Sequence, residues 1–179
     1  MPELPEVETI KNELLPCVIG QRFTRVAVFD TEMISGLSPD EFRRKLTGKT
    51  IDCLDRRGKY LIFNLVGTQA LIMHFRMTGA LLLLLNPEKS VSFVRAIFHL
   101  SDNSRLVFVD ARRLGLIWLV EDITSVVGRL GVEPLSGRFT PAVLRWQLGQ
   151  HHIPVKAALL DQSIIAGIGN MYADEALFA

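Results

Sequence analysis

The strongest constraint on the fold is the period of two that the apolar residues keep from residue 50 to residue 120. Such alternation indicates strands with one buried face, and short turns between them join antiparallel neighbours. Gly58, Gly79 and Asn103 are examples of the turn residues. The predicted strands are residues 51–54, 60–66, 70–75, 80–85, 93–100, 106–109 and 114–120, preceded by 22–29. Hairpins without intervening helices fold as an antiparallel sandwich or barrel.

Helical signals flank this region. Apolar residues at helical spacing predict a helix over residues 5–15, which Pro16 should end or kink. A capping box at Ser38 predicts a short helix to residue 46. Three more helices are predicted over 140–148, 155–161 and 171–178. We therefore expect an α+β fold with a sandwich domain over 1–121, a linker rich in glycine and proline over 122–139, and a helical domain over 140–179.

Composition excludes some classes of protein. With 49% hydrophobic and 22% charged residues, the chain is expected to bury a core. No apolar run approaches the ~18 residues that span a bilayer, and no leader peptide precedes the first helix, so we expect a cytoplasmic protein without a membrane partner. Cys17 and Cys53 belong to no C-x-x-C pair. We predict that both are buried thiols, outside any disulfide or metal site.

The formal net charge of +1 does not by itself indicate a nucleic-acid partner. The distribution of the charges is more informative, because basic residues gather at the turns between apolar strands. Bases at loop tips can form a phosphate-binding face even in a nearly neutral protein. These residues are Arg56, Arg57, Lys59, Arg76, Arg112 and Arg113.

The first residues have the composition of a nucleophilic site. Pro2 is small enough for the initiator methionine to be removed, which would leave a free secondary amine. An α-amino group has a pKa near ~8, so more of it is neutral and nucleophilic than a lysine side chain. Such amines form Schiff bases with carbonyl carbons, and Glu3 and Glu6 could move the protons. The ordinary interpretation is a helix start with proline and glutamate in its first turn.

Gly167, Gly169 and Asn170 precede the last predicted helix, with Asn170 as its cap. Free N–H groups at a helix start can bind an anion, and Lys156 could reach the same phosphate. A packing turn and a solvated lysine are the ordinary interpretations. Met77 and Leu114 end strands beside arginines, which suits either core residues or wedges that enter a base stack.

Five motifs occur together and in order along the chain, at residues 2–8, 57–61, 74–79, 110–115 and 156–178. Together they closely resemble the formamidopyrimidine-DNA glycosylase (Fpg/MutM) family of bacterial base-excision repair enzymes. The resemblance covers essentially the whole chain. It implies an N-terminal helix packed on an antiparallel β-sandwich, followed by a helix–two-turn–helix domain that binds DNA.

The resemblance also implies roles for individual residues. Pro2 would attack the sugar of an oxidised purine nucleotide, and Glu3 would be the general acid/base for ring opening and for β- and δ-elimination. Glu6 would support the site, and Lys59 would bind a flanking phosphate and assist catalysis. The implied partner is double-stranded DNA with oxidised purines or abasic sites, bound by a monomer near the bacterial nucleoid. The implied DNA-binding residues are His74, Met77, Arg112, Leu114, Lys156, Gly169 and Asn170.

Two departures from the family pattern affect these expectations. The family commonly has phenylalanine at the position of Leu114, so stacking beside the unpaired base should be weaker. The last helix also reaches residue 178 without a stop signal, so we expect that the helix–two-turn–helix domain is incomplete. The zinc finger of the family would then lie beyond residue 179, and no cofactor is expected in this chain.

Three alternatives stay open at this point. The Nei branch of the superfamily removes oxidised pyrimidines, but its members usually have glycine where this chain has Leu4. A DNA-binding fragment with little or no catalysis is the second alternative, because the domain is incomplete. A tautomerase that uses a free N-terminal proline is the third, although such chains lack the basic hairpins and the helical domain.

Overall fold

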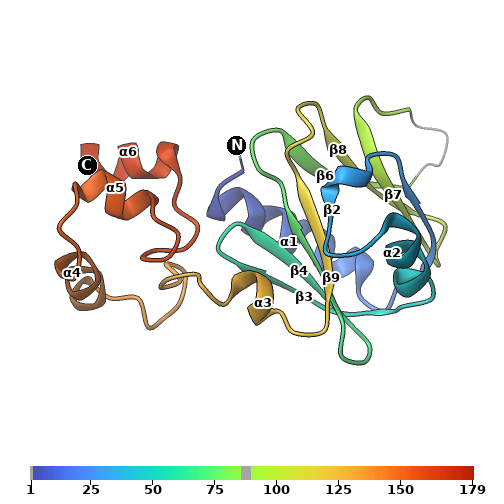
Figure 1. Cartoon of the computed structure of the whole chain (residues 1–179), viewed down its shortest axis with the longest axis horizontal. Coiled ribbons are helices and arrows are strands. Elements are labelled where there is room, and N and C mark those ends of the chain that lie inside the picture. The colour runs from blue at the N-terminus through green and yellow to red at the C-terminus, as the bar shows by residue number, and fades with distance from the viewer. Residues whose placement is uncertain (1, 86–89) are drawn as a thin grey trace.

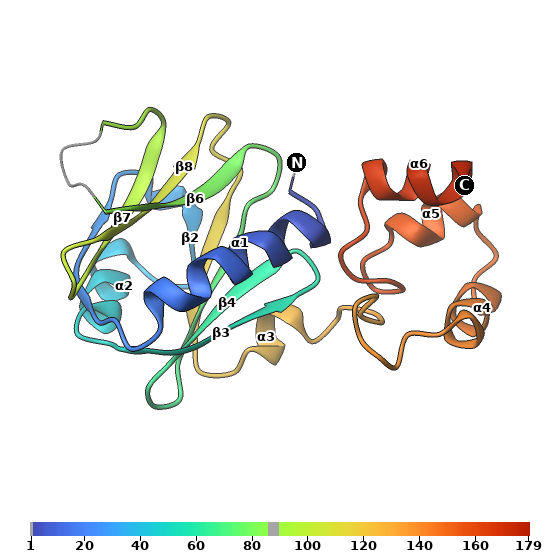
Figure 2. The same ribbon diagram turned by 180° about the vertical axis from the view of Figure 1, so that it is seen from behind.

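The computed structural model describes residues 2–85 and 90–179. A sandwich of two sheets and a group of small helices lie at opposite ends of an elongated molecule, with helix α1 (Leu4–Val18) along the sandwich (Figure 1, Figure 2). Mixed helices and antiparallel sheets confirm the predicted α+β class. The other helices are η1 (Thr31–Met33), α2 (Pro39–Leu46), α3 (Thr124–Val127), α4 (Pro141–Gly149), α5 (Val155–Leu160) and α6 (Asn170–Phe178).

The strands form a four-stranded sheet of order β1-β7-β8-β6 and a five-stranded sheet of order β2-β9-β5-β4-β3. All pairs are antiparallel except the short parallel pair of β2 with β9. The strands are β1 (Phe23–Val28), β2 (Ile34–Ser35), β3 (Ile51–Arg57), β4 (Tyr60–Leu65), β5 (Ala70–His74), β6 (Gly79–Leu84), β7 (Val94–Leu100), β8 (Arg105–Asp110) and β9 (Leu116–Val120).

Two connections cross from one sheet to the other at the same end of the sandwich. The β5–β6 loop leaves the five-stranded sheet, and the β8–β9 loop returns to it. Gly79 pairs with Asp110 in one sheet, and His74 pairs with Leu116 in the other. Because both pairs of strands are neighbours, the two crossing loops must lie side by side.

Aromatic rings fill the space between the sheets. Phe98 meets Phe23 and Phe42 edge to face, with ring centroids 5.9 and 6.5 Å apart, and Phe75 stacks on Phe108 at 5.7 Å. All five side chains are almost completely buried. Such interlocked aromatic packing fixes the relative position of the two sheets.

The helical end has a small core of its own. Ala158, Leu159, Ile164, Ile165 and Ala173 are buried together, from α5, α6 and the turns between them. A turn at residues 162–164 and a bend at residues 166–167 lead from α5 to α6. The segment predicted as a linker, residues 122–139, contains the short helix α3.

Several local predictions are wrong. Helix α1 continues past Pro16 to Val18, because the proline costs only one hydrogen bond in the last turn. Cys17 and Cys53 are exposed, since each lies on the outer face of its element. Asn170 is the first residue of α6 and does not cap it, and Gly169 holds the cap position.

Candidate active site at the junction of the sandwich and the helical end

The carboxylate of Glu3 lies on the N-terminus of α6, from the opposite end of the chain. Its oxygens accept hydrogen bonds from the backbone N–H groups of Gly169 at 2.6 Å, Met171 at 3.0 Å and Tyr172 at 3.4 Å. Glu3 is 2% exposed. The glycine loop is therefore an anion site, as its sequence indicated, but the anion that it holds in this structure is a carboxylate of the protein.

This approach depends on glycine at two positions. A Cβ atom at Gly169 would lie 2.4 Å from the Glu3 carboxyl carbon. At Gly167 a Cβ would lie 2.6 Å from Leu4, and the backbone has a φ of +92°, which favours glycine. The Gly167 carbonyl also accepts the Leu4 N–H at 3.0 Å. The loop before α6 is thus fitted to the first turn of α1.

Lys59 lies beside this carboxylate and is 9% exposed. Burial lowers the pKa of the Lys59 ammonium, and the nearby charge of Glu3 opposes that shift only in part. Pro2 precedes Glu3 and is half-buried. The structure therefore gathers Pro2, Glu3 and Lys59, three of the predicted catalytic residues, at the junction.

Glu6 is fixed from both sides. It accepts the backbone N–H of Glu3 at 2.8 Å and the hydroxyl of Tyr172 at 2.8 Å. Burial acts to raise the pKa of Glu6, but hydrogen bonds, chiefly those from the Glu3 N–H and the Tyr172 hydroxyl, help to bring the pKa below its ordinary value. The side chain thus links α1 to α6 and holds the backbone of Glu3.

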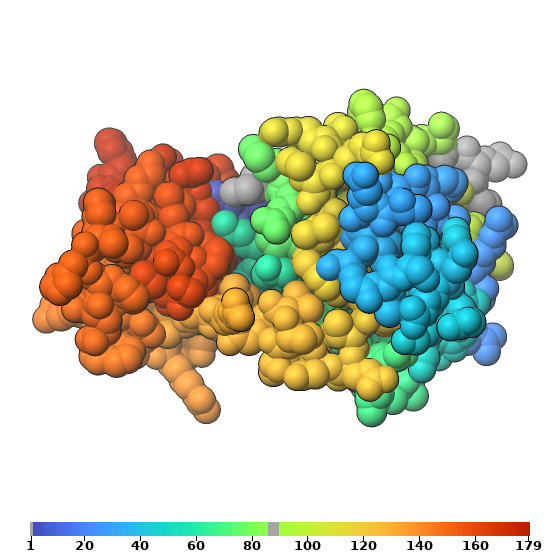
Figure 3. All heavy atoms as spheres, viewed as in Figure 1, coloured from blue at the N-terminus to red at the C-terminus, as the bar shows by residue number. Residues whose placement is uncertain are grey.

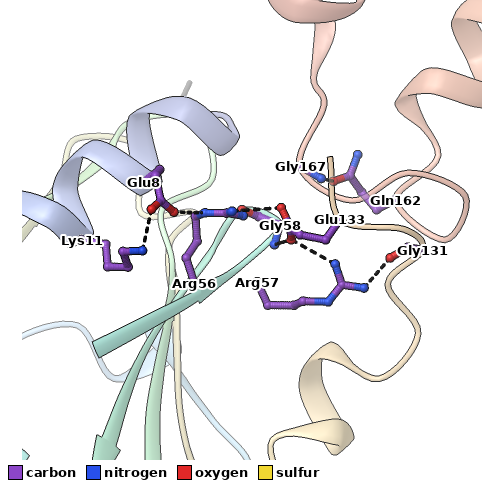
Figure 4. Close-up of polar contacts among 9 residues, drawn as sticks. All are labelled: Glu8, Lys11, Arg56, Arg57, Gly58, Gly131, Glu133, Gln162 and Gly167. Carbon is purple, nitrogen blue, oxygen red and sulfur yellow. Dashed lines mark hydrogen bonds and ion pairs between the residues drawn. The ribbon is translucent and has the colours of Figure 1, made fainter. Parts of the chain in front are cut away.

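A cluster of charged residues holds the helical end to the sandwich (Figure 4). Glu133 forms an ion pair with Arg56 at 2.9 Å, and it accepts hydrogen bonds from Arg57 at 3.0 Å and from the Gly58 N–H at 3.0 Å. Arg56 also pairs with Glu8 of α1 at 2.6 Å. Burial acts to raise the pKa of Glu133, but the Arg56 guanidinium and the Gly58 N–H lower it overall. We call Glu8, Arg56, Arg57 and Glu133 the junction cluster.

The two crossing loops carry the residues predicted to enter DNA. Met77 is 47% and Leu114 40% exposed, and Arg112 is also exposed. The Arg112 guanidinium contacts the Met77 sulfur at 3.4 Å. We call Met77, Arg112 and Leu114 the probe residues. Figure 1 and Figure 2 both show the β5–β6 loop beside the N-terminus, on the side that faces the helical end.

His74 has a different environment from the other predicted DNA-binding residues. It is 9% exposed, its ring lies edge-on to Tyr60 at 4.6 Å, and its Nδ1 accepts the Arg76 N–H at 3.1 Å. Burial, helped by the charges of Arg76 and Lys59, lowers the pKa of His74 to about 4. The structure therefore places His74 under the Met77 loop as a neutral support.

The remaining predicted DNA-binding residues lie on the helical end. Lys156 on α5 pairs with Asp174 on α6 at 2.5 Å, and both side chains are largely exposed. Asn170 is exposed at the start of α6, next to the Glu3 carboxylate. Figure 3 shows the helical end and the sandwich as two lobes with a hollow between them above the connecting segment.

Three important residues were not predicted from the sequence. Tyr172 and Glu133 act through contacts with residues far away in the chain, and nothing in their local sequence indicates those partners. Asp110 ends a strand and resembles an ordinary turn aspartate. Its signal was the turn that follows it at residues 111–115, where one carboxylate could bind several N–H groups.

No helix in the described part of the chain is long and apolar enough to cross a membrane. Within residues 2–85 and 90–179, no three His, Cys, Asp or Glu side chains lie close enough to hold a metal ion.

Comparison with known proteins now places the chain in a family. The model of the formamidopyrimidine-DNA glycosylase N-terminal domain matches residues 1–117, and that of the H2TH domain matches residues 130–179. The chain belongs to the formamidopyrimidine-DNA glycosylase family. This confirms the resemblance found in the sequence.

Relatives in the formamidopyrimidine-DNA glycosylase family match over almost the whole chain. The enzyme of Moorella thermoacetica is 43% identical over 183 residues, which cover 100% of this chain and 67% of that protein. The Lactococcus lactis enzyme bound to DNA with an abasic site is 31% identical with a TM-score of 0.88, covering 98% of this chain and 68% of that one.

A second Lactococcus lactis complex contains DNA with an oxidised pyrimidine. It is 32% identical with a TM-score of 0.88, and covers 98% of this chain and 67% of that one. Among the first curated relatives, the chain spans between 59% and 67% of their length.

Proposed function

We propose that the chain carries the chemistry of a bifunctional DNA glycosylase and abasic-site lyase that removes oxidised purines, namely 8-oxoguanine and formamidopyrimidines. The observation that supports this most directly is the position of Glu3. The residue next to the prospective N-terminal amine is held by three N–H groups of the H2TH domain, beside a buried lysine. A nucleophile, a carboxylate and a cation thus meet where the two domains join.

The proposed reaction starts after Met1 has been removed. The Pro2 nitrogen attacks C1′ of the nucleotide, and the glycosidic bond breaks with its electron pair leaving on the base, which takes up a proton. Glu3 takes up the proton that the Pro2 nitrogen loses after attack and donates it to O4′ as the ring opens, and the freed nitrogen lone pair completes an iminium at C1′. The iminium makes the C2′ proton acidic. Loss of that proton expels the 3′ phosphate, a second proton loss expels the 5′ phosphate, and water releases the amine.

Other residues of the chain would bind the DNA. The damaged base must leave the stack, and the probe residues would fill the space that it leaves, with Arg112 facing the opposite base. Lys59 would contact a flanking phosphate, and Lys156, Gly169 and Asn170 would lie along the backbone. The proposed partner is double-stranded DNA, bound by a monomer in the bacterial cytoplasm at the nucleoid. The proposed chemistry uses only the N-terminal amine and side chains of the protein and needs no cofactor.

Borohydride trapping on duplexes with 8-oxoguanine or an abasic site tests the proposal. Reduction of the iminium should give a covalent protein–DNA adduct. Adduct formation should persist in Pro2→Gly, which keeps a terminal amine, and should be abolished by N-terminal acetylation. If the unmodified chain forms no adduct on either duplex, it is a DNA-binding fragment without this chemistry.

Oxidised pyrimidines are the second candidate substrate class. The observation that supports this class is the Lactococcus lactis complex with an oxidised pyrimidine, because that relative shares the fold of this chain. A dihydrothymine duplex run beside the 8-oxoguanine duplex separates the two classes. We expect faster trapping on 8-oxoguanine, and the reverse order would favour the pyrimidine activity.

A further inference from the structure

The β5–β6 and β8–β9 loops, which carry the probe residues, leave the sandwich side by side. Side-chain contacts between the two loops, in addition to the strands that they join, set their relative position. The β5–β6 loop carries Met77, and the β8–β9 loop carries Arg112. Each loop crosses between the sheets, so only one end of each is held by a given sheet. Loops of this kind are mobile unless side chains connect them.

One buried carboxylate connects these loops. Asp110 is 1% exposed, and its oxygens accept the backbone N–H groups of Arg112 at 3.1 Å, Leu114 at 2.8 Å and Gly115 at 2.7 Å. It also accepts the hydroxyl of Thr78 from the other loop. The Thr78 oxygen in turn accepts the Arg112 N–H at 3.2 Å. Thr78 lies on the β5–β6 loop and is hydrogen-bonded to Asp110 and Arg112, so it connects the two loops.

The surroundings leave the β8–β9 loop little freedom. Arg113 has a φ of 58°, and its guanidinium binds both oxygens of Asp30 at 2.7 and 2.9 Å. A Cβ at Gly115 would lie 2.7 Å from the Phe108 ring. Burial acts to raise the pKa of Asp110, but the Thr78 hydroxyl and the loop N–H groups lower it overall. The carboxylate is therefore charged when it binds these donors.

We propose that Asp110 and Thr78 are positioning residues that lock Met77 and Arg112 into a single rigid probe of the base pair. This inference rests on the proposed function of the probe residues. A probe that is already ordered loses little conformational freedom when it enters the stack, so more of its contact energy distinguishes one base from another. Neither residue touches the reacting atoms, and both act through the loops that they connect.

Thr78→Val and Thr78→Ser form a matched pair of variants. Valine keeps the shape and removes the hydroxyl, whereas serine keeps the hydroxyl. Thr78 is exposed, so neither change should unfold the sandwich. In Thr78→Val we expect excision of 8-oxoguanine from duplex DNA to fall about tenfold, with a smaller preference between cytosine and adenine opposite the lesion. Thr78→Ser should retain most of both.

Trapping on a single strand with an abasic site is the control, because it needs no probe. Both variants should trap there at the rate of the unchanged chain. If Thr78→Val also loses single-strand trapping, the change acts on the active site or the fold, and the proposal is wrong. If its duplex excision and opposite-base preference are unchanged, the proposal is likewise wrong.

Amide hydrogen exchange tests the same inference without any activity. The Arg112 N–H should exchange about tenfold faster in Thr78→Val than in Thr78→Ser, since one of its two acceptors is gone. Asp110→Asn should also release the Leu114 and Gly115 N–H groups. Equal exchange in the two Thr78 variants overturns the lock even if the chain proves to be an active glycosylase. If exchange is faster in Thr78→Val but the chain forms no borohydride adduct, the positioning role of Thr78 is supported and the proposed glycosylase function is wrong.

Discussion

The sandwich and the helical end are stabilised by different interactions. Six phenylalanine side chains are fully buried in the sandwich, whereas the core cluster of the helical end consists of five smaller side chains, and no aromatic ring is buried there among the described residues. Small cores contribute little net stability. The helical end is instead held by Glu3 on α6, by the Tyr172–Glu6 hydrogen bond and by the junction cluster. The proposed chemistry is located where the weaker region meets the stronger one.

This difference implies that the two ends respond differently to loss of core volume. Phe98→Ala should destabilise the whole molecule by about 4 kcal/mol, because it leaves a cavity among interlocked rings. Ile165→Ala should cost about 3 kcal/mol but act mainly on the helical end. The two tryptophans, Trp118 in β9 and Trp146 in α4, report the two ends separately by fluorescence during urea unfolding.

Single-tryptophan variants make that measurement specific. With Ile165→Ala, the Trp146 transition should move to lower urea while the Trp118 transition stays. With Phe98→Ala, both should move. Equal movement of both probes with Ile165→Ala would show that the molecule unfolds as one unit, and the comparison of the two ends would be wrong.

Glu133→Gln breaks the junction cluster. Arg56 is 5% exposed, so removing one of its two carboxylate partners leaves a buried charge poorly compensated. We expect a loss of about 3 kcal/mol, seen by Trp146 and not by Trp118. Glu41→Gln is the matched control, because its pair with Lys45 is on the surface and should change nothing measurable. If Glu133→Gln is as stable as this control, the junction cluster does not hold the helical end to the sandwich.

Gly169→Ala tests the contact between the ends at the proposed active site. The added methyl would meet the Glu3 carboxyl carbon, while the φ of −121° is acceptable for alanine. Displacing Glu3 by a fraction of an ångström should slow borohydride trapping about a hundredfold. Gly137→Ala is the control, since a methyl there meets nothing. Trapping at the original rate in Gly169→Ala would show that the position of Glu3 is not critical.

The same comparison explains which features the sequence could predict. Which loops cross between the sheets depends on the pairing of distant strands and was not predicted. Strand alternation has a local cause, so the sandwich could be predicted from residues a few positions apart. The motifs around Met77 and Arg112 could be found for the same reason. By contrast, Glu3 and Gly169 are 166 positions apart. The glycine loop indicated an anion site, but no local pattern showed that the anion is Glu3.

The burial of polar side chains was the other feature that sequence patterns could not predict. His74 and Lys59 stand beside turns, where exposure is the ordinary expectation, yet each is only 9% exposed. Cys17 and Cys53 show the reverse, because thiols are usually buried and these two lie on outer faces. In each case the tertiary contact decides, and it involves residues from several elements.

We expect the smallest effect for His74→Phe, which tests whether the His74 ring is kept from water as a core side chain is. The pKa of His74 is about 4 in the folded state and 6.5 when exposed. Between these values the unfolded chain binds a proton that the folded chain excludes, so stability is lost as the pH falls. From about pH 7 to about pH 5 the free energy of unfolding of the original chain should fall by about 2 kcal/mol through this group, and that of His74→Phe should not.

Near pH 7 the variant should be about 1 kcal/mol less stable than the original chain, because the Arg76 N–H loses its acceptor. Urea unfolding followed by Trp118 at both pH values measures the difference, and equal pH dependence in the two proteins would mean that His74 is hydrated in the folded state.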